Sequence, residues 1–202
     1  MRKILKKQQR LLLKESKVNK MISDRLIQQL KRGLKNADEK DFYEFAKFFL
    51  QNKRIYVTGA GRSGLVGKFF AMRLMHLGNK VFVLGETNTP SIQKGDILVC
   101  ISASGSTSSV VNAATTAKKH AATILAITAN PKGILQELSD FTVMINNRDN
   151  KRRKKHNVND RKTPLGTLFE LSSLLYLETL ISEIMYVCNI DEETMRARHI
   201  NI

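Results

Sequence analysis

Short apolar runs alternate with longer helix-like segments through most of this chain. From residue 54 onward, the strand-like runs end at glycine or polar turns, and segments with helical spacing follow most of them. The runs are RIYVT, KVFVLG, DILVCIS, TILAITA and FTVMIN, beginning at residues 54, 80, 96, 123 and 141. Strands joined through helices form a parallel sheet with helices on both faces. The sequence therefore predicts a three-layer α/β sandwich of the Rossmann or flavodoxin kind.

The N-terminal quarter of the chain has a helical pattern instead. Residues 4–34 place apolar side chains at helical spacing among Lys, Gln and Arg, and residues 42–50 continue this pattern. We interpret residues 1–50 as a helical arm and residues 51–202 as one α/β domain. With 202 residues and 42% hydrophobic content, the chain can bury one substantial core but not a second large domain.

The formal charge of +16 is concentrated in two segments. Residues 1–20 carry eight Lys and Arg against one acidic residue, and residues 146–162 carry eight against two. Neither segment has interleaved aromatics for base stacking, so we interpret both as solvated and do not expect a nucleic-acid partner. Two cysteines without metal or redox spacing, no signal peptide and no apolar stretch of membrane-spanning length indicate a cytoplasmic protein without membrane contact.

A glycine-rich turn follows the first strand-like run. In VTGAGRSG, Gly59, Gly61 and Gly64 have the G-x-G-x-x-G spacing of a dinucleotide-binding turn. Such a turn lets backbone N–H groups approach an anion at a helix N-terminus, which serves any phosphate. A site for NAD also needs an acidic residue after the second strand, and Glu86 lies 22 residues beyond Gly64. The turn alone leaves NAD and other phosphates open.

A second phosphate-binding signal follows the third strand-like run. The loop at residues 102–109 (SASGSTSS) places six hydroxyls in eight residues, and a helix-like segment follows. Hydroxyls and N–H groups at a helix N-terminus make a neutral anion cradle. One or two of them would be explained as helix caps, but six exceed that need. A sugar-phosphate site has a use for this second cradle, whereas a dinucleotide site does not.

The strand, the S-x-S-G-x-T loop and the helix resemble the sugar isomerase (SIS) domain family, whose Ser/Thr loop binds a sugar phosphate. Four segments are similar to the 6-phospho-3-hexuloisomerases of this family: GAGRSGLVGKFFAMRLMHLG, GETNTP, TPLGTLFE and ETMRARHIN, which begin at residues 59, 85, 163 and 193. The resemblance covers the chain from about residue 20 to the end. It implies interconversion of D-arabino-3-hexulose 6-phosphate and D-fructose 6-phosphate through an enediol, a reaction of the ribulose monophosphate pathway.

This chemistry requires a phosphate anchor, donors for the enediolate and a base, but no redox cofactor, and the resemblance implies no metal. The residues that the resemblance assigns to the phosphorylated ketose are Gly61, Arg62, Ser63, Glu86, Ser102, Ser104, Gly105 and Thr107. Arg62 is expected to neutralise phosphate or enediolate charge, with a surface salt bridge as its alternative. Relatives often carry a charged residue where Ser106 and Ser108 stand, so contacts from those two positions stay open.

For the base we expect Glu170, a carboxylate near the start of a helix that is apolar nearly all round. Its structural alternative is a capping box, because Thr167-Leu-Phe-Glu170 has the T-x-x-E spacing. The GTLFE motif shared with the family favours catalysis. Glu86, in the loop after the second strand, is the competing carboxylate, with a solvent-facing turn residue as its alternative.

His199, in the C-terminal tail, matches a histidine that related isomerases place in the active site of a neighbouring subunit. The resemblance therefore implies that it is the acid/base partner and that the protein is a homotetramer. His76 ends a helix-like segment, where an imidazolium favours the negative end of the helix dipole, so we assign it a structural role.

Other functions stay open from the sequence. Arabinose 5-phosphate isomerase, another SIS enzyme, has a similar first loop but normally carries lysine where Arg62 stands. The other alternative is a non-catalytic sugar-phosphate sensor, although residues 1–50 are too short and featureless for the DNA-binding module of such regulators. An NAD enzyme is third, supported only by the glycine turn and Glu86.

Overall fold

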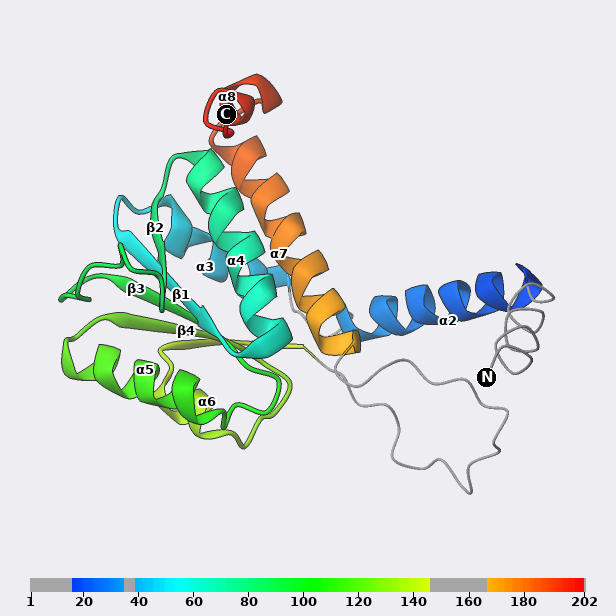
Figure 1. Ribbon diagram of the computed structural model, residues 1–202, viewed down its shortest axis with the longest axis horizontal. Helices are drawn as coiled ribbons and strands as arrows, with labels where there is room; N and C mark the ends of the chain where they lie inside the picture. Colours follow the sequence, from blue (N-terminus) through cyan, green and yellow to red (C-terminus); the bar gives the residue numbers. More distant parts are fainter. Residues whose placement is uncertain (1–15, 35–38, 146–166, 202) are drawn as a thin grey trace, which may run out of the picture.

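The computed structural model describes residues 16–34, 39–145 and 167–201. It contains one sheet in which all neighbouring strands are parallel, in the order β2-β1-β3-β4-β5 (Figure 1). The strands are β1 (Arg54–Gly59), β2 (Lys80–Val83), β3 (Ile97–Ile101), β4 (Thr123–Thr128) and β5 (Phe141–Met144). The predicted parallel α/β sheet is confirmed. The basic segment 146–162 lies outside the described residues, as do residues 1–15.

Helices cover both faces of the sheet, as predicted (Figure 1). One face carries α4 (Gly61–Leu77), α7 (Thr167–Val187), α3 (Glu39–Lys47) and the short 3-10 helix η1 (Phe48–Leu50), and the other carries α5 (Ser108–Lys119) and α6 (Ile134–Leu138). The last helix, α8 (Glu192–Arg196), packs on α4. None of the helices within the described residues combines the length and the apolar character needed to span a bilayer.

The sheet separates two apolar clusters because successive side chains of a strand point to opposite faces. Ile55 and Val57 of β1 face α4 and α7, whereas Tyr56 between them faces α5. All five residues of β3 are fully buried, as expected for the central strand of a sheet with helices on both faces. This strand therefore ends in a rigid part of the core, and the serine-rich loop begins there.

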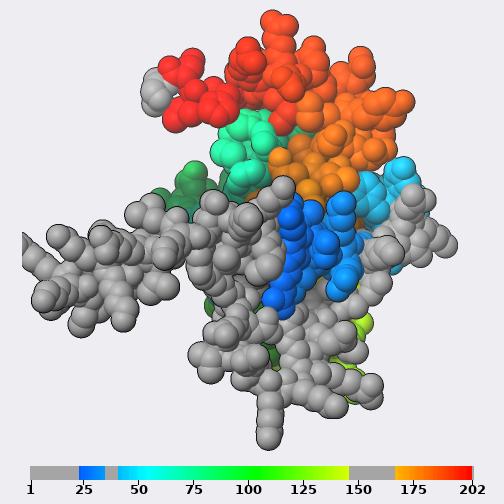
Figure 2. Space-filling model, turned by 90° about the vertical axis from the view of Figure 1, so that its right-hand side faces the viewer, coloured from blue at the N-terminus to red at the C-terminus, as the bar shows by residue number. Residues whose placement is uncertain are grey.

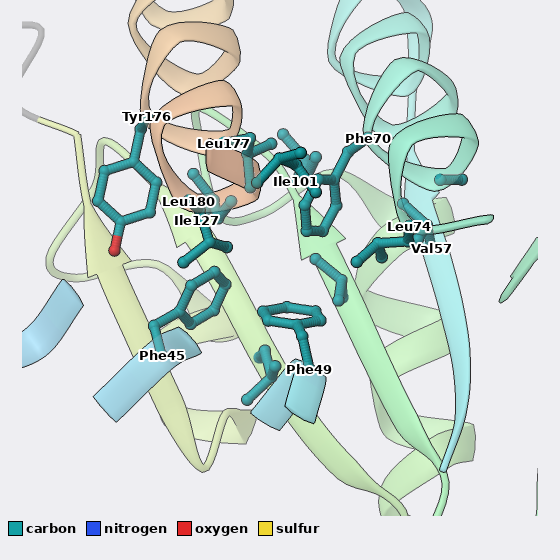
Figure 3. Packing of buried hydrophobic residues seen from close by; sticks show 14 of the residues in the cluster. Phe45, Phe49, Val57, Phe70, Leu74, Ile101, Ile127, Tyr176, Leu177 and Leu180 are labelled. Atoms are coloured by element: carbon teal, nitrogen blue, oxygen red, sulfur yellow. The ribbon is translucent and has the colours of Figure 1, made fainter. Parts of the chain in front are cut away.

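Aromatic side chains fill the larger cluster under α4 and α7 (Figure 3). Phe49 meets both Phe45 and Phe70 in edge-to-face pairs, with ring centroids 5.2 and 5.3 Å apart. Phe45 and Phe49 come from α3 and η1, so these two elements, within the segment interpreted as an arm, pack into the core of the domain. The helix before them, α2 (Ser16–Leu34), lies against α7 (Figure 2) and extends away from the sheet (Figure 1).

Candidate active site

The order of the strands places a topological switch point at the carboxyl end of the sheet, where proteins of this kind have their ligand-binding crevice. From β1 the chain moves outward to β2, then returns past β1 to β3 and continues to β4 and β5 in the other direction. The helices that follow β1 and β3 therefore lie on opposite faces, and their first turns separate beside adjacent strands. Parallel α/β proteins bind ligands at such a switch point. Both predicted phosphate loops, after Gly59 of β1 and after Ile101 of β3, meet at this place because these two residues are paired in register.

The glycines of the first loop pack the strand against its helix. A Cβ on Gly64 would lie 2.7 Å from the carbonyl oxygen of Gly59, and a Cβ on Gly59 would lie 2.9 Å from the backbone nitrogen of Gly64. Gly61, the first residue of α4, has a φ of +55° and open space around it. Gly59 and Gly64 thus serve the contact between β1 and α4, a role that explains them without a ligand. Arg62 and the buried Ser63 follow directly in the first turn of α4.

The second loop gathers three of its predicted hydroxyls. Thr107 Oγ1 lies 3.0 Å from Ser102 Oγ and 3.4 Å from Ser104 Oγ. Thr107 is the N-cap residue of α5, yet its side chain makes no capping hydrogen bond. The hydroxyls therefore face one another at the start of α5, where the helix dipole attracts an anion. A capping hydrogen bond therefore does not explain the position of the Thr107 hydroxyl.

Residues that the sequence analysis did not assign hold this loop in shape. Gly105, at a φ of +62°, packs so closely on Gly133 that a Cβ there would lie 3.2 Å from its Cα. The Asn130 side chain donates to the Ser104 carbonyl at 2.9 Å, and the backbone N–H of Leu135 donates to the Gly105 carbonyl at 2.9 Å. Gly105 thus shapes the backbone of the cradle. The sequence ANPKG at residues 129–133 is typical of a turn. Only the packing of β3 beside β4 brings that turn to the serine loop.

Glu170 reaches the first loop through Arg62. Its Oε2 lies 3.6 Å from Arg62 Nη2, and its side chain is 12% exposed. This oxygen is buried and forms no hydrogen bond within the described residues. Thr167 is the first helical residue of α7, and residue 166 lies outside the described ranges, so the structure does not test the capping-box alternative. The ion pair brings a carboxylate from α7 next to the turn that contains Ser63.

Glu86 lies on another side of the first loop, beyond the end of β2. Its Oε1 accepts a hydrogen bond from Lys68 Nζ at 2.6 Å, and both side chains are about half exposed. Glu86 also lines a groove of about 500 Å³ between the residues that follow β2 and the outer side of α5. Its carboxylate is thus solvated and paired with a lysine, whereas that of Glu170 is buried.

His199 lies far from the other predicted residues of its own chain. Its ring packs on His76, with centroids 5.1 Å apart, at the C-terminal end of α4. Arg62 is at the opposite end of this 17-residue helix, which is about 25 Å long. His199 is exposed there, beside a cavity of about 360 Å³ between α4, α7 and α8. Within one chain, the tail and the crevice cannot form a single site.

His76, to which the sequence assigns a structural role, lies at the C-terminal end of α4. The side chain is buried, and burial, with His199 and Arg73 nearby, lowers the pKa of His76 below its usual value. Burial therefore disfavours the charged form of the ring. The cation at this helix end is Arg198, whose guanidinium donates to the His76 carbonyl at 2.9 Å.

In the described part of the chain, no three His, Cys, Asp or Glu side chains gather as a metal site would require.

Taken together, a parallel sheet, a hydroxyl cradle at its switch point and a carboxylate beside it define the class of sugar-phosphate-binding α/β proteins. Residues 48–158 match the SIS domain family, which covers more than half of the sequence. The chain belongs to this family.

Several relatives that match most of this chain have the same name, 3-hexulose-6-phosphate isomerase. A 3-hexulose-6-phosphate isomerase of Methylomonas aminofaciens is 42% identical, over 74% of this chain and 80% of its own length. A protein of the same name from Methanocaldococcus jannaschii is 40% identical, over 76% of this chain and 79% of its own. A crystal structure of a Methanococcus jannaschii protein, for which a 3-hexulose-6-phosphate isomerase function was inferred, superposes with a TM-score of 0.73 and 37% identity, over 89% of this chain and 96% of that one.

Proposed function

We propose that this chain is a 3-hexulose-6-phosphate isomerase, which interconverts D-arabino-3-hexulose 6-phosphate and D-fructose 6-phosphate. The observation that carries the proposal is the cluster of Ser102, Ser104 and Thr107 hydroxyls at the switch point of the sheet. Its support is the similarity to relatives of that name over most of both chains. The conversion moves a carbonyl between two carbons of one phosphorylated ketose, so it needs a phosphate anchor and proton transfer.

The phosphate binds the hydroxyl cradle and the N-terminus of α5, with Ser63 of the neighbouring loop as a fourth hydroxyl and Gly61 keeping the backbone accessible. Fixing the phosphate fixes the register of the sugar carbons against the base. Glu170 removes the proton from C2 of the 3-hexulose, which gives the 2,3-enediol, and returns it to C3 to form fructose 6-phosphate. Glu86, at the rim on the β2 side, is available to the sugar hydroxyls.

The proton that moves between the two oxygens requires a second group, for which we propose His199 of a neighbouring subunit. Exposed apolar side chains support an interface: Leu65, Met72 and Met75 follow one side of α4, and Leu175 lies on the adjacent α7. If two copies pack these faces together about a two-fold axis, antiparallel α4 helices bring the tail of one copy to the crevice of the other. Two such dimers would form the homotetramer that the family resemblance implies.

Subunit mixing tests this arrangement. Glu170→Gln and His199→Ala should each lose at least about 100-fold in kcat, because each removes one proton-transfer group. Random mixing of the two inactive variants should restore about one quarter of wild-type activity, since hybrid interfaces contain one intact site. Hybrids that stay inactive would show that the two residues do not share a site across an interface.

The function itself is tested with fructose 6-phosphate in deuterated water, without added cofactor, followed by NMR. We expect deuterium at C3 of fructose 6-phosphate and a new 3-ketose signal. Exchange at C1 instead would indicate an aldose–ketose isomerase, such as one acting on arabinose 5-phosphate. Binding without any exchange would indicate a sugar-phosphate sensor.

The cradle predicts a specific effect on the Michaelis constant. Thr107→Val keeps the shape of the side chain but removes the hydroxyl that lies against both serines. Losing one hydrogen bond to a charged phosphate should raise KM about 30-fold with little change in kcat. Ser109→Ala, on the exposed first turn of α5, is the matched control and should leave KM unchanged. An unaltered KM in Thr107→Val would remove this residue from the phosphate site.

A further inference from the structure

Two Arg–Glu pairs join α4 to α7, and they differ in geometry. Further along the helices, Arg73 makes a two-pronged contact with Glu178, with Nε to Oε1 at 3.1 Å and Nη2 to Oε2 at 3.2 Å. At the crevice end, Arg62 Nη2 and Glu170 Oε2 stand 3.6 Å apart, which is too long for a hydrogen bond. The Arg73–Glu178 pair shows that these two helices can hold a guanidinium and a carboxylate within hydrogen-bond distance. The wider spacing of Arg62 and Glu170 near the crevice therefore requires its own explanation.

The spacing of the Arg62–Glu170 pair leaves the buried Glu170 Oε2 without a hydrogen bond in the described part of the chain. A buried, unsatisfied oxygen usually costs about 1–3 kcal/mol, so one that is retained suggests a functional requirement. A base must accept a proton, and an oxygen already bound by a guanidinium fork has less capacity to do so. At 3.6 Å, the arginine supplies charge and direction while Oε2 keeps its acceptor positions.

We infer that Arg62 is a positioning residue for the base: it aims the Glu170 carboxylate at the substrate carbon and leaves Oε2 available for the proton. The inference rests on the proposed isomerase function. It replaces a surface salt bridge as the role of Arg62. It also differs from direct phosphate binding, because a phosphate ligand acts mainly on substrate affinity.

The decisive experiment compares Arg62→Ala with Arg73→Ala. Each variant removes one partner of an α4–α7 pair whose arginine is at least one-third exposed, so both should stay folded, as thermal unfolding will verify. In Arg62→Ala, kcat for fructose 6-phosphate should fall about 100-fold with KM within about twofold of wild type, because a displaced base acts on the chemical step. Arg62→Lys, which keeps the charge, should retain an intermediate kcat.

Rescue of kcat by added guanidinium separates a positioning role of Arg62 from a purely structural one. Because the Arg62 side chain is 48% exposed, millimolar guanidinium can enter the space left by Arg62→Ala and should raise kcat in a saturable manner, but should leave Arg73→Ala unchanged. A rise in KM with normal kcat, or a fall in kcat without rescue, would overturn the inference. An inactive wild-type protein would instead refute the proposed function, so the two failures are distinguishable.

Discussion

Glu170→Gln should lower kcat for the interconversion of fructose 6-phosphate and the 3-hexulose phosphate by about 1,000-fold. The amide has the shape of the carboxylate but cannot accept the proton from C2 or C3. Substrate affinity, measured by calorimetry, should stay close to wild type, because the phosphate cradle lies on another loop. Deuterium exchange into fructose 6-phosphate should disappear together with turnover, since both require the same proton transfer.

Two matched variants separate the base from a structural carboxylate. Glu178→Gln changes the same residue type two turns further along α7, in the pair with Arg73, and should leave kcat unaltered. Glu86→Gln tests the competing carboxylate, which is exposed and bound to Lys68. If Glu170→Gln keeps its activity while Glu86→Gln loses it, the base is Glu86, on the β2 side of the crevice, and not Glu170.

The strands and main helices could be predicted from the sequence because their signal is local. Runs such as DILVCIS combine β-branched and apolar residues between polar boundaries, and β3 was found inside that run. The packing of Phe45 and Phe49 into the main core could not be predicted, because an amphipathic pattern does not say which surface it will cover. The same limit applies to the order of the strands, which determines where the crevice lies.

In the candidate site too, contacts within one loop could be predicted from the sequence, whereas contacts between residues far apart in the sequence could not. Ser102, Ser104 and Thr107 lie within six residues, so a single loop brings their hydroxyls together. Contacts of Glu170 with Arg62 and of His199 with His76 depend on how α7 and the tail pack on α4, which no short motif encodes. The burial of His76 was not predicted for the same reason, because a position at the end of a helix does not say which elements pack on it.

Gly64→Ala should destabilise the fold even though alanine is the better helix former. In an exposed helix, alanine would gain about 1 kcal/mol over glycine. Here its Cβ would meet the carbonyl oxygen of Gly59 at 2.7 Å, and displacing backbone costs about 3 kcal/mol. The expected net loss is about 2 kcal/mol, a fall of about 6 °C in Tm for a chain of this size. Thermal unfolding followed by circular dichroism measures it.

Gly67→Ala, one turn later in α4, is the graded control. Its Cβ would meet the Val57 Cγ1 methyl at 3.0 Å, which is a longer contact and with a side-chain rather than a backbone atom, so Tm should fall less than in Gly64→Ala. If Gly64→Ala is as stable as Gly67→Ala, the close packing of β1 on α4 is not what requires Gly64. If Gly64→Ala is less stable and also loses kcat, the cause is displacement of the first turn of α4. This displacement moves Arg62 and Ser63 together and thereby changes the orientation of the Glu170 carboxylate.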